Sequence, residues 1–257
     1  CAAPPMPSGP GLPRTASVHR FAGDPARFNY IPLRGWDRGD TVGLLEAIAA
    51  FVEPGRLQIE DIREYARDSL DFAERYLRNH GGEDPHGLNL EQIAALNLYT
   101  KENIGNGLQS FFSVMNRALN GENRKQARPF FPFLKLFIEA ARRLPNACPM
   151  KLWRAFPNLD SEWQKSYPIG KEVFWWAFSS CTKRAEVLEN PNFFGPKGER
   201  TLYMLDCISG IDISSYSDYA SESEVLLMPG SLFVVEQTMA PKMLGGALQV
   251  VMTQKPS

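Results

Sequence analysis

Hydrophobic residues recur with a helical period through the first part of the chain. From about residue 41 to residue 147, apolar side chains return every three to four positions with charged residues between them, as on amphipathic helices. We interpret these stripes as packing faces and not as ligand sites. The predicted helical segments cover residues 41–49, 59–79, 90–97, 104–119 and 133–144, with breaks at Pro54-Gly55 and over residues 80–85.

The pattern changes from Met150 onward. Short runs rich in aromatic and aliphatic residues are now separated by Gly, Pro, Asn and Asp, which is typical of β-strands. The predicted strands are residues 150–156, 172–179, 201–208, 224–228, 232–237 and 247–253, with one or two helical turns over 183–188. Helices first and strands after favour an α+β fold, with the helices packed on one side of an antiparallel or mixed sheet.

Three regions are therefore expected along the chain. Proline at positions 4, 5, 7, 10 and 13 denies regular hydrogen bonding to residues 1–17, which are predicted to form a disordered tail. Residues 18–147 form the helical region and residues 148–257 the β-rich region. Because the sequence begins with Cys and not with Met, we expect a fragment or a processed form.

Composition excludes few functions but favours a protein without a metal or a nucleic-acid partner. The chain of 257 residues is 44% hydrophobic and carries a net charge of -1, so neither nucleic acid nor an acidic membrane is expected as a partner. No apolar run approaches the roughly 20 residues that span a bilayer. The four cysteines follow no zinc-ligand spacing. Buried free thiols are expected, and a disulfide of Cys148 is left open.

Two polar features follow the predicted strands. Arg154 lies among Leu152, Trp153, Ala155 and Phe156, where a charge is costly unless it meets an anion. The alternative is an arginine that reaches the surface or pairs with a nearby carboxylate. A cluster of small hydroxyl residues follows the strand that ends near Phe178, and its alternative role is a helix N-cap. That cluster is Ser179-Ser180-Cys181-Thr182.

A pair of carboxylates leads into the apolar run at 225–228. In an extended segment, residues two apart point to one face, so Glu222 and Glu224 are expected to project into one cleft while Ser223 faces away. The alternative is a solvated hairpin edge. A Glu-x-Glu pair has little specificity by itself, and it gains weight only from its context.

Taken together, these features resemble the arginine-specific mono-ADP-ribosyltransferases, the family with an Arg, Ser and Glu-x-Glu signature. Arg154, the Phe-Ser-Ser-Cys-Thr stretch at 178–182 and Glu222-Ser223-Glu224 before Val-Leu-Leu-x-Pro match it in order and spacing. The resemblance extends upstream through residues 98–102, 115–119 and 134–145, and so covers about residues 88–253. It implies one continuous domain from about residue 88, with a split sheet that binds NAD in the cleft.

The resemblance also implies roles for individual residues. Arg154 would contact the NAD phosphates, with Ala155 where the family usually has Gly. Ser180 would help to fix the nicotinamide ribose. Glu224 would be the catalytic carboxylate, and Glu222 would orient and deprotonate an acceptor arginine.

Three aromatic residues are further candidates. Tyr219 occupies the position where the family's acceptor-recognition loop often has an aromatic ring, and Phe193 or Phe194 would stack on the nicotinamide. Each of them can equally be a core residue. The usual Ser-Thr-Ser appears here as Ser180-Cys181-Thr182.

The expected activity is transfer of ADP-ribose from NAD, as a substrate, to an accessible arginine of a partner protein, with no metal. An NAD glycohydrolase that uses water as the acceptor is the alternative, and a catalytically silent NAD- or protein-binding module is the alternative from another class. A secreted or translocated protein is expected ahead of a resident cytoplasmic one. The sequence does not predict the acceptor protein or the oligomeric state.

Overall fold

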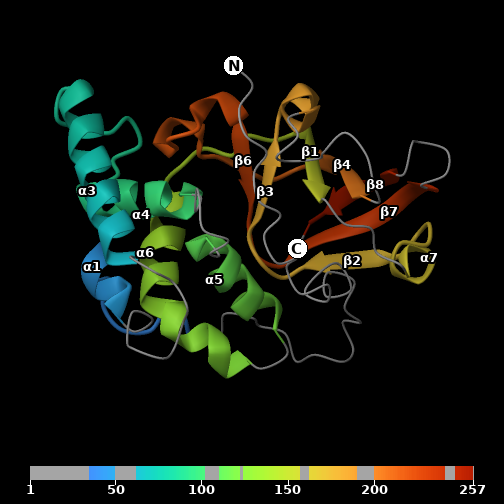
Figure 1. Cartoon of the computed structure of the whole chain (residues 1–257), viewed down its shortest axis with the longest axis horizontal. Coiled ribbons are helices and arrows are strands. Elements are labelled where there is room, and N and C mark those ends of the chain that lie inside the picture. Colours follow the sequence, from blue (N-terminus) through green and yellow to red (C-terminus); the bar gives the residue numbers. More distant parts are fainter. Residues whose placement is uncertain are drawn as a thin grey trace, which may run out of the picture.

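The computed structural model describes residues 35–49, 62–101, 110–121, 124–156, 162–189, 200–240 and 247–256. The helices up to residue 141 gather on one side of the molecule and the strands on the other, as Figure 1 shows. This arrangement confirms the predicted α+β fold. The tail predicted at 1–17 and the candidates Phe193 and Phe194 lie outside the described residues.

The helices agree with the hydrophobic periods of the sequence. In the long helix α3, the buried residues Ile62, Ala66, Ser69 and Ala73 follow each other at three or four positions. Helix α4 differs because it is buried almost throughout, and it begins with a capping box of Asn89 and Gln92. The helices are α1 (Leu44–Ala47), α3 (Ile62–Asn79), α4 (Leu90–Thr100), α5 (Phe111–Asn120), α6 (Phe131–Ala141) and the 3₁₀ helix η3 (Arg124–Phe130).

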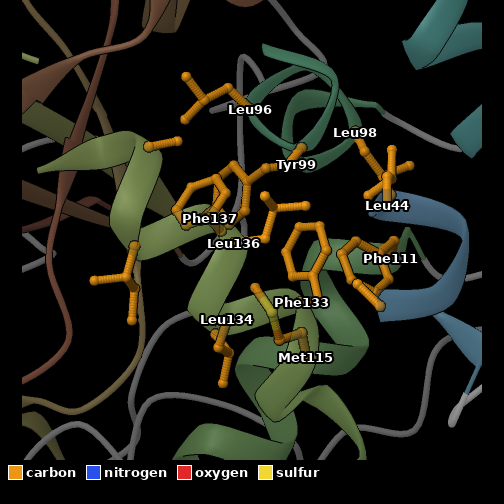
Figure 2. Packing of buried hydrophobic residues seen from close by; sticks show 14 of the residues in the cluster. Leu44, Leu96, Leu98, Tyr99, Phe111, Met115, Phe133, Leu134, Leu136 and Phe137 are labelled. Carbon is orange, nitrogen blue, oxygen red and sulfur yellow. The ribbon is translucent and has the colours of Figure 1, made fainter. Parts of the chain in front are cut away.

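Aromatic rings form the centre of the helical layer. Tyr99 of α4 packs against Phe137 of α6, with ring centroids 5.0 Å apart, and Phe133 meets Phe111 edge to face at 4.7 Å. These side chains and Met115 converge in Figure 2. The stripes of α5 and α6 thus pack into this core, as predicted, although Phe112 of α5 also lines a cleft. Helix α6 ends at Ala141, three residues before the predicted end at Leu144.

The strands form one mixed sheet in the order β2-β7-β8-β4-β1-β3-β6-β5. Within the described residues, β4 and β8 are parallel, and the other neighbouring pairs are antiparallel. The strands are β1 (Met150–Phe156), β2 (Glu172–Trp175), β3 (Ser179–Thr182), β4 (Arg200–Cys207), β5 (Ile211–Asp212), β6 (Glu224–Leu227), β7 (Ser231–Met239) and β8 (Ala247–Lys255). Short helical turns lie between them: α7 (Trp163–Ser166), η4 (Ala185–Glu189), η5 (Ser214–Tyr216) and η6 (Ala220–Glu222).

The sheet is split between β1 and β3. These two strands share a single register pair, Trp153 with Thr182, whereas β1 and β4 are paired along the whole of β1. The five strands from β2 to β1 and the three strands β3, β6 and β5 therefore form two halves. A second core lies between the halves and contains Leu152, Leu205 and Val225.

Strand β6 is buried on both faces, which explains its uninterrupted apolar sequence. Val225 and Leu227 belong to the core between the sheet halves, and Leu226 belongs to the core under the helices. Residues of the same parity as Leu226, including Glu224, point toward the helical side.

Two strand predictions differ from the structure. The strand predicted at 172–179 is two strands, β2 and β3, separated by residues 176–178. The hydroxyl cluster Ser179–Thr182 is therefore itself a strand, β3, and does not follow the end of one. Since Trp176, Ala177 and Phe178 are as apolar as the strands around them, hydrophobicity alone does not mark this break.

The described cysteines form no disulfide with one another. Cys148, Cys181 and Cys207 are free thiols, and burial raises the pKa of Cys181 to about 12, so that this thiol is protonated at neutral pH. Across the described ranges, none of the helices combines the length and the apolar character needed to cross a bilayer.

Candidate active site

A cleft of about 250 Å³ opens where the sheet splits. Five of the predicted site residues line it together: Arg154, Ala155, Ser180, Glu222 and Glu224. The helices supply Tyr99, Thr100, Phe112 and Asn116, and the strands and turns also supply Trp153, Cys181, Thr182 and Leu188. Residues from positions 99 to 224 thus converge on one site with apolar walls and a few charged groups, which is the usual composition of a small-molecule site.

Arg154 bridges the two halves of the sheet. It belongs to β1, and its Nη1 donates a hydrogen bond to the backbone carbonyl of Ser180 in β3. The guanidinium carbon lies 4.6 Å from the centroid of the Phe156 ring, within the range of a cation–π contact. This half-buried cation faces the cleft, so an anionic ligand would find a positive partner there.

Ser180 and Glu224 are held by backbone pairing between β3 and β6. Thr182 is paired with Glu224 and Ser180 with Leu226, and directly paired residues project from the same face of a sheet. Because Leu226 faces the helices, Ser180, Thr182 and Glu224 face them too. Glu224 is the first residue of its strand, so its carboxylate stands on a rigid element at the cleft.

Glu222 reaches the cleft by a route that the sequence did not predict. It ends the 3₁₀ turn η6, and Ser223 has a left-handed backbone with φ 52°. The segment is therefore not extended, and the argument that residues two apart share a face is wrong here. The two carboxylates converge because a tight turn leads into β6. Thr182 fixes that turn, since its Oγ1 donates to the carbonyl of Glu222 at 2.7 Å.

Sequence reasoning missed the helical wall of the cleft. Phe112 lies on a stripe that was interpreted as a packing face, and Asn116 belongs to the same predicted helix. Tyr99 and Thr100 lie beyond the end of the helix predicted at 90–97. Asn116 carried a usable signal, because it stands one helical turn after Phe112 and borders the buried stripe of α5. An amide in such a position needs a hydrogen-bond partner, which a ligand or a site residue can supply.

Tyr99 is the most buried of these four residues. It is 1% exposed, and its ring also contacts Phe112 and Phe178, each with centroids 5.8 Å away. Its hydroxyl is hydrogen-bonded to Ser180, and Asn116 Nδ2 donates to it at 3.4 Å. Burial, with Glu224 nearby as a second cause, raises the pKa of Tyr99 to about 12, so the hydroxyl stays neutral at physiological pH.

Tyr219 is not among the residues that line the cleft. Its backbone nitrogen donates to Ser217 Oγ at 3.0 Å, and its carbonyl accepts from the backbone nitrogen of Glu222 at 2.9 Å. It therefore stands at the start of the turn that carries Glu222, and its role toward an acceptor stays a prediction. No group of three or more His, Cys, Asp or Glu side chains among the described residues is arranged to hold a metal ion.

Comparison with known proteins gives a family and a fold. The model of the NAD:arginine ADP-ribosyltransferase family matches residues 62–250. A search of curated proteins found no match. The type III effector XopAI from Xanthomonas axonopodis pv. citri is similar in structure, with a TM-score of 0.59, 18% identity and coverage of 82% of this chain and 86% of that chain.

Two ADP-ribosyltransferases are similar to a comparable degree. HopU1 of Pseudomonas syringae pv. Tomato DC3000 has a TM-score of 0.56 and 18% identity, over 82% of this chain and 96% of its own. Vis, from Vibrio splendidus, was solved in complex with agmatine and has a TM-score of 0.54 and 15% identity, over 81% of this chain and 90% of its own. At these identities the likeness shows a shared fold.

Proposed function

The chain belongs to the NAD:arginine ADP-ribosyltransferase family, a family of enzymes that transfer ADP-ribose from NAD, and we propose that it modifies an arginine side chain of a partner protein. The observation that carries this proposal is the presence of two carboxylates, Glu222 and Glu224, in the same cleft as Arg154 and Ser180. The two carboxylates come from different backbone elements, a turn and a strand.

The first half of the reaction breaks the bond between nicotinamide and ribose. Its electron pair leaves with the nicotinamide ring nitrogen, and the ribose carbon develops oxocarbenium character, much as in glycoside hydrolysis. Glu224 would stabilise that positive charge, which exists only near the transition state. Nicotinamide leaves as a neutral ring and needs no acid to protonate it.

Arg154 and Ser180 would hold the dinucleotide for this step. Arg154 would bind the phosphates, because a guanidinium donates two parallel hydrogen bonds to such groups. Ser180 would fix the nicotinamide ribose, with its own hydroxyl oriented by Tyr99. Ala155 beside Arg154 is small enough for a ligand to approach the backbone there. Phe193 and Phe194 stay predicted stacking partners of the nicotinamide.

The second half of the reaction joins the ribose carbon to a guanidinium nitrogen of the acceptor. A guanidinium is protonated at neutral pH and is a poor nucleophile, so a carboxylate must bind it and accept a proton as the new C–N bond forms. Glu222 would do both. Vis was solved with agmatine, whose guanidinium is that of arginine, and this supports a guanidinium as the acceptor group here.

One experiment separates this proposal from its alternatives. The protein is incubated with NAD labelled in the adenylate part, with and without agmatine, and the products are separated. Labelled ADP-ribosyl-agmatine is the expected result. Label found wholly in free ADP-ribose would instead establish an NAD glycohydrolase, and unconsumed NAD with measurable NAD binding would establish a silent module.

The variant Glu222→Gln tests the division of labour between the two carboxylates. We expect transfer to agmatine to fall by about 100-fold or more, as on removal of a general base, while NAD hydrolysis falls much less. Asp206→Asn is the matched control, since its carboxylate pairs with Lys151 on the exposed face of β1 and β4. Equal losses of transfer and hydrolysis in Glu222→Gln would contradict the proposed roles.

We also propose that the protein is secreted or translocated. XopAI is described as a type III effector. That description agrees with a secreted or translocated protein, which stays a prediction.

A further inference from the structure

The turn segment, defined here as residues 214–222, is anchored to the helical layer by side chains far away in the sequence. It comprises η5 and η6 and ends at Glu222. Three side chains of the helical layer, Asp84, Asn97 and Lys101, hold it through hydrogen bonds or an ion pair. Their contacts cross 117 to 132 positions of the sequence.

Asn97 of α4 is the central anchor. It is fully buried, and its Nδ2 donates to the carbonyl of Tyr216 at 3.1 Å and to Oδ1 of Asp218 at 3.2 Å. A buried amide is costly unless it is hydrogen-bonded, so these contacts explain why a polar residue stands in this apolar helix. Both acceptors lie in the turn segment.

Lys101, at the C-terminal end of α4, provides the second anchor. Its Nζ lies 2.8 Å from Oδ2 of Asp218, and its side chain is only 16% exposed. Residues four apart share one face of a helix, so Asn97 and Lys101 reach the turn segment from the same side. Tyr99 and Thr100, in the same helical turn, line the cleft. The end of α4 therefore contacts both the cleft and the segment that carries Glu222.

Asp84 provides the third anchor, between α3 and α4. This carboxylate is 7% exposed and accepts hydrogen bonds from the hydroxyl groups of Tyr216 at 2.9 Å and Tyr76 at 3.2 Å. The backbone nitrogens of His86 and Leu88 also donate to it, at 2.8 and 3.1 Å. Tyr216 is thus held at both ends, by Asn97 at its carbonyl and by Asp84 at its hydroxyl.

We propose that Asp84, Asn97 and Lys101 are positioning residues that act through Tyr216 and Asp218 to hold Glu222 against the acceptor guanidinium. This inference rests on the proposed function, because it concerns the acceptor half of that reaction. The nearest anchored residue, Asp218, is four positions before Glu222. Loss of the anchors should therefore allow the Glu222 carboxylate to move away from the position of the acceptor. Glu224 is fixed separately by the pairing of β6 with β3.

The inference predicts a selective loss. Without the anchors, cleavage of NAD at Glu224 continues, but water replaces the guanidinium as acceptor more often. The ratio of transfer to hydrolysis should fall, while the KM for NAD stays unchanged. A general loss of folding would lower both activities together and would leave the ratio as it was.

The test compares Lys101→Ala, Asp218→Ala and the double variant with the wild type. The kcat and KM for agmatine transfer and for NAD hydrolysis are measured for each. We expect each single variant to lower the ratio about fivefold, the scale of one partly buried ion pair. The double variant should be no worse than Asp218→Ala, since that substitution already removes the Lys101 contact together with the hydrogen bond from Asn97. Lys101→Arg should keep the ratio of transfer to hydrolysis close to the wild-type value, because its guanidinium can still pair with Asp218.

One further test variant and one control make the test specific. Tyr216→Phe removes only the hydroxyl that Asp84 binds, and it should lower the ratio while the ring stays packed. Lys165→Ala removes another lysine–carboxylate contact, with Glu162 at 3.3 Å beside α7, far from α4 in Figure 1, and it should leave the ratio unchanged.

The outcomes separate the two proposals. A wild type that transfers to agmatine, with unchanged ratios in Lys101→Ala, Asp218→Ala and Tyr216→Phe, overturns the positioning inference alone. A wild type that hydrolyses NAD but never modifies agmatine overturns the proposed function, and the inference with it.

Discussion

Tyr99→Phe tests whether the helical wall takes part in catalysis. The substitution keeps the ring among Phe112, Phe137 and Phe178 and deletes only the hydroxyl, which is hydrogen-bonded to Ser180 and accepts from Asn116. Because burial raises the pKa of Tyr99 to about 12, the hydroxyl cannot act as a base near neutral pH. Its expected role is to orient the Ser180 hydroxyl.

The magnitudes follow from that contact. Two buried polar partners lose a hydrogen bond, so the free energy of unfolding should fall by about 2 kcal/mol, or about 4–8 °C in Tm. A misoriented Ser180 should weaken ribose positioning by about 1 kcal/mol, which lowers kcat about fivefold. Hydrolysis and transfer should fall equally, since both pass through the same ribose cation.

The assay is a double-mutant cycle between Tyr99→Phe and Ser180→Ala, with kcat and KM measured for NAD hydrolysis. If Tyr99 acts through Ser180, removing its hydroxyl costs little once Ser180 is already alanine. The shape of the pH profile should be the same in Tyr99→Phe and the wild type. Rate losses that multiply in the double variant would refute the reasoning, as would a Tyr99→Phe enzyme with unaltered kcat.

Three further predictions concern other parts of the molecule. Glu224→Gln should remove nearly all NAD turnover and leave Tm within about 2 °C, as compared by activity and calorimetry; full activity would overturn its catalytic role. Burial alone would raise the pKa of Asp84, but hydrogen bonds from Leu88, Tyr216, His86 and Tyr76 hold it below its ordinary 3.8. The stabilisation from the Asp84 carboxylate is therefore complete above about pH 4 and is lost as the pH falls through the lowered pKa. The Tm of Asp84→Asn should be lower than that of the wild type at neutral pH, and it should vary less with pH than the wild-type Tm below about pH 4. Gly210→Ala should lower the free energy of unfolding by about 1–3 kcal/mol in denaturant titration, because the new Cβ would lie 2.8 Å from Val225 Cγ1 and 3.2 Å from Cys148 Sγ.

The elements could be predicted where one hydrophobic period dominates. Helix α3 and strand β4 follow their patterns closely, because each buries one face and leaves the other less buried. Prediction failed between β2 and β3, because residues 173–178 are all apolar and the break at residues 176–178 depends on which strands the two segments pair with. Tertiary pairing decides that break, and local sequence carries no sign of it.

The site was predictable for residues that sit on strands and less so for residues on helices or turns. Arg154 stood out because a charge interrupts an apolar strand, and Ser180 because small hydroxyl residues follow an apolar run. Tyr99 lies beyond the helix predicted at 90–97 and was included only in the segment 98–102 of the resemblance. Its place in the cleft depends on contacts of α4 with Phe178 and Ser180, which no local pattern encodes. Phe193 and Phe194 lie outside the described residues, so their predicted roles stand as they were.

The two glutamates show how a correct expectation can rest on a wrong geometry. Extended backbone would have placed Glu222 and Glu224 side by side on one rigid strand, with no independent control of either. Instead, the left-handed Ser223 separates a turn from a strand. Glu224 depends on the β3–β6 pairing, whereas Glu222 depends on Thr182 and on the anchors of the turn segment. Cleavage of NAD and capture of the acceptor are therefore expected to respond to different mutations, which a rigid Glu-x-Glu strand would not allow.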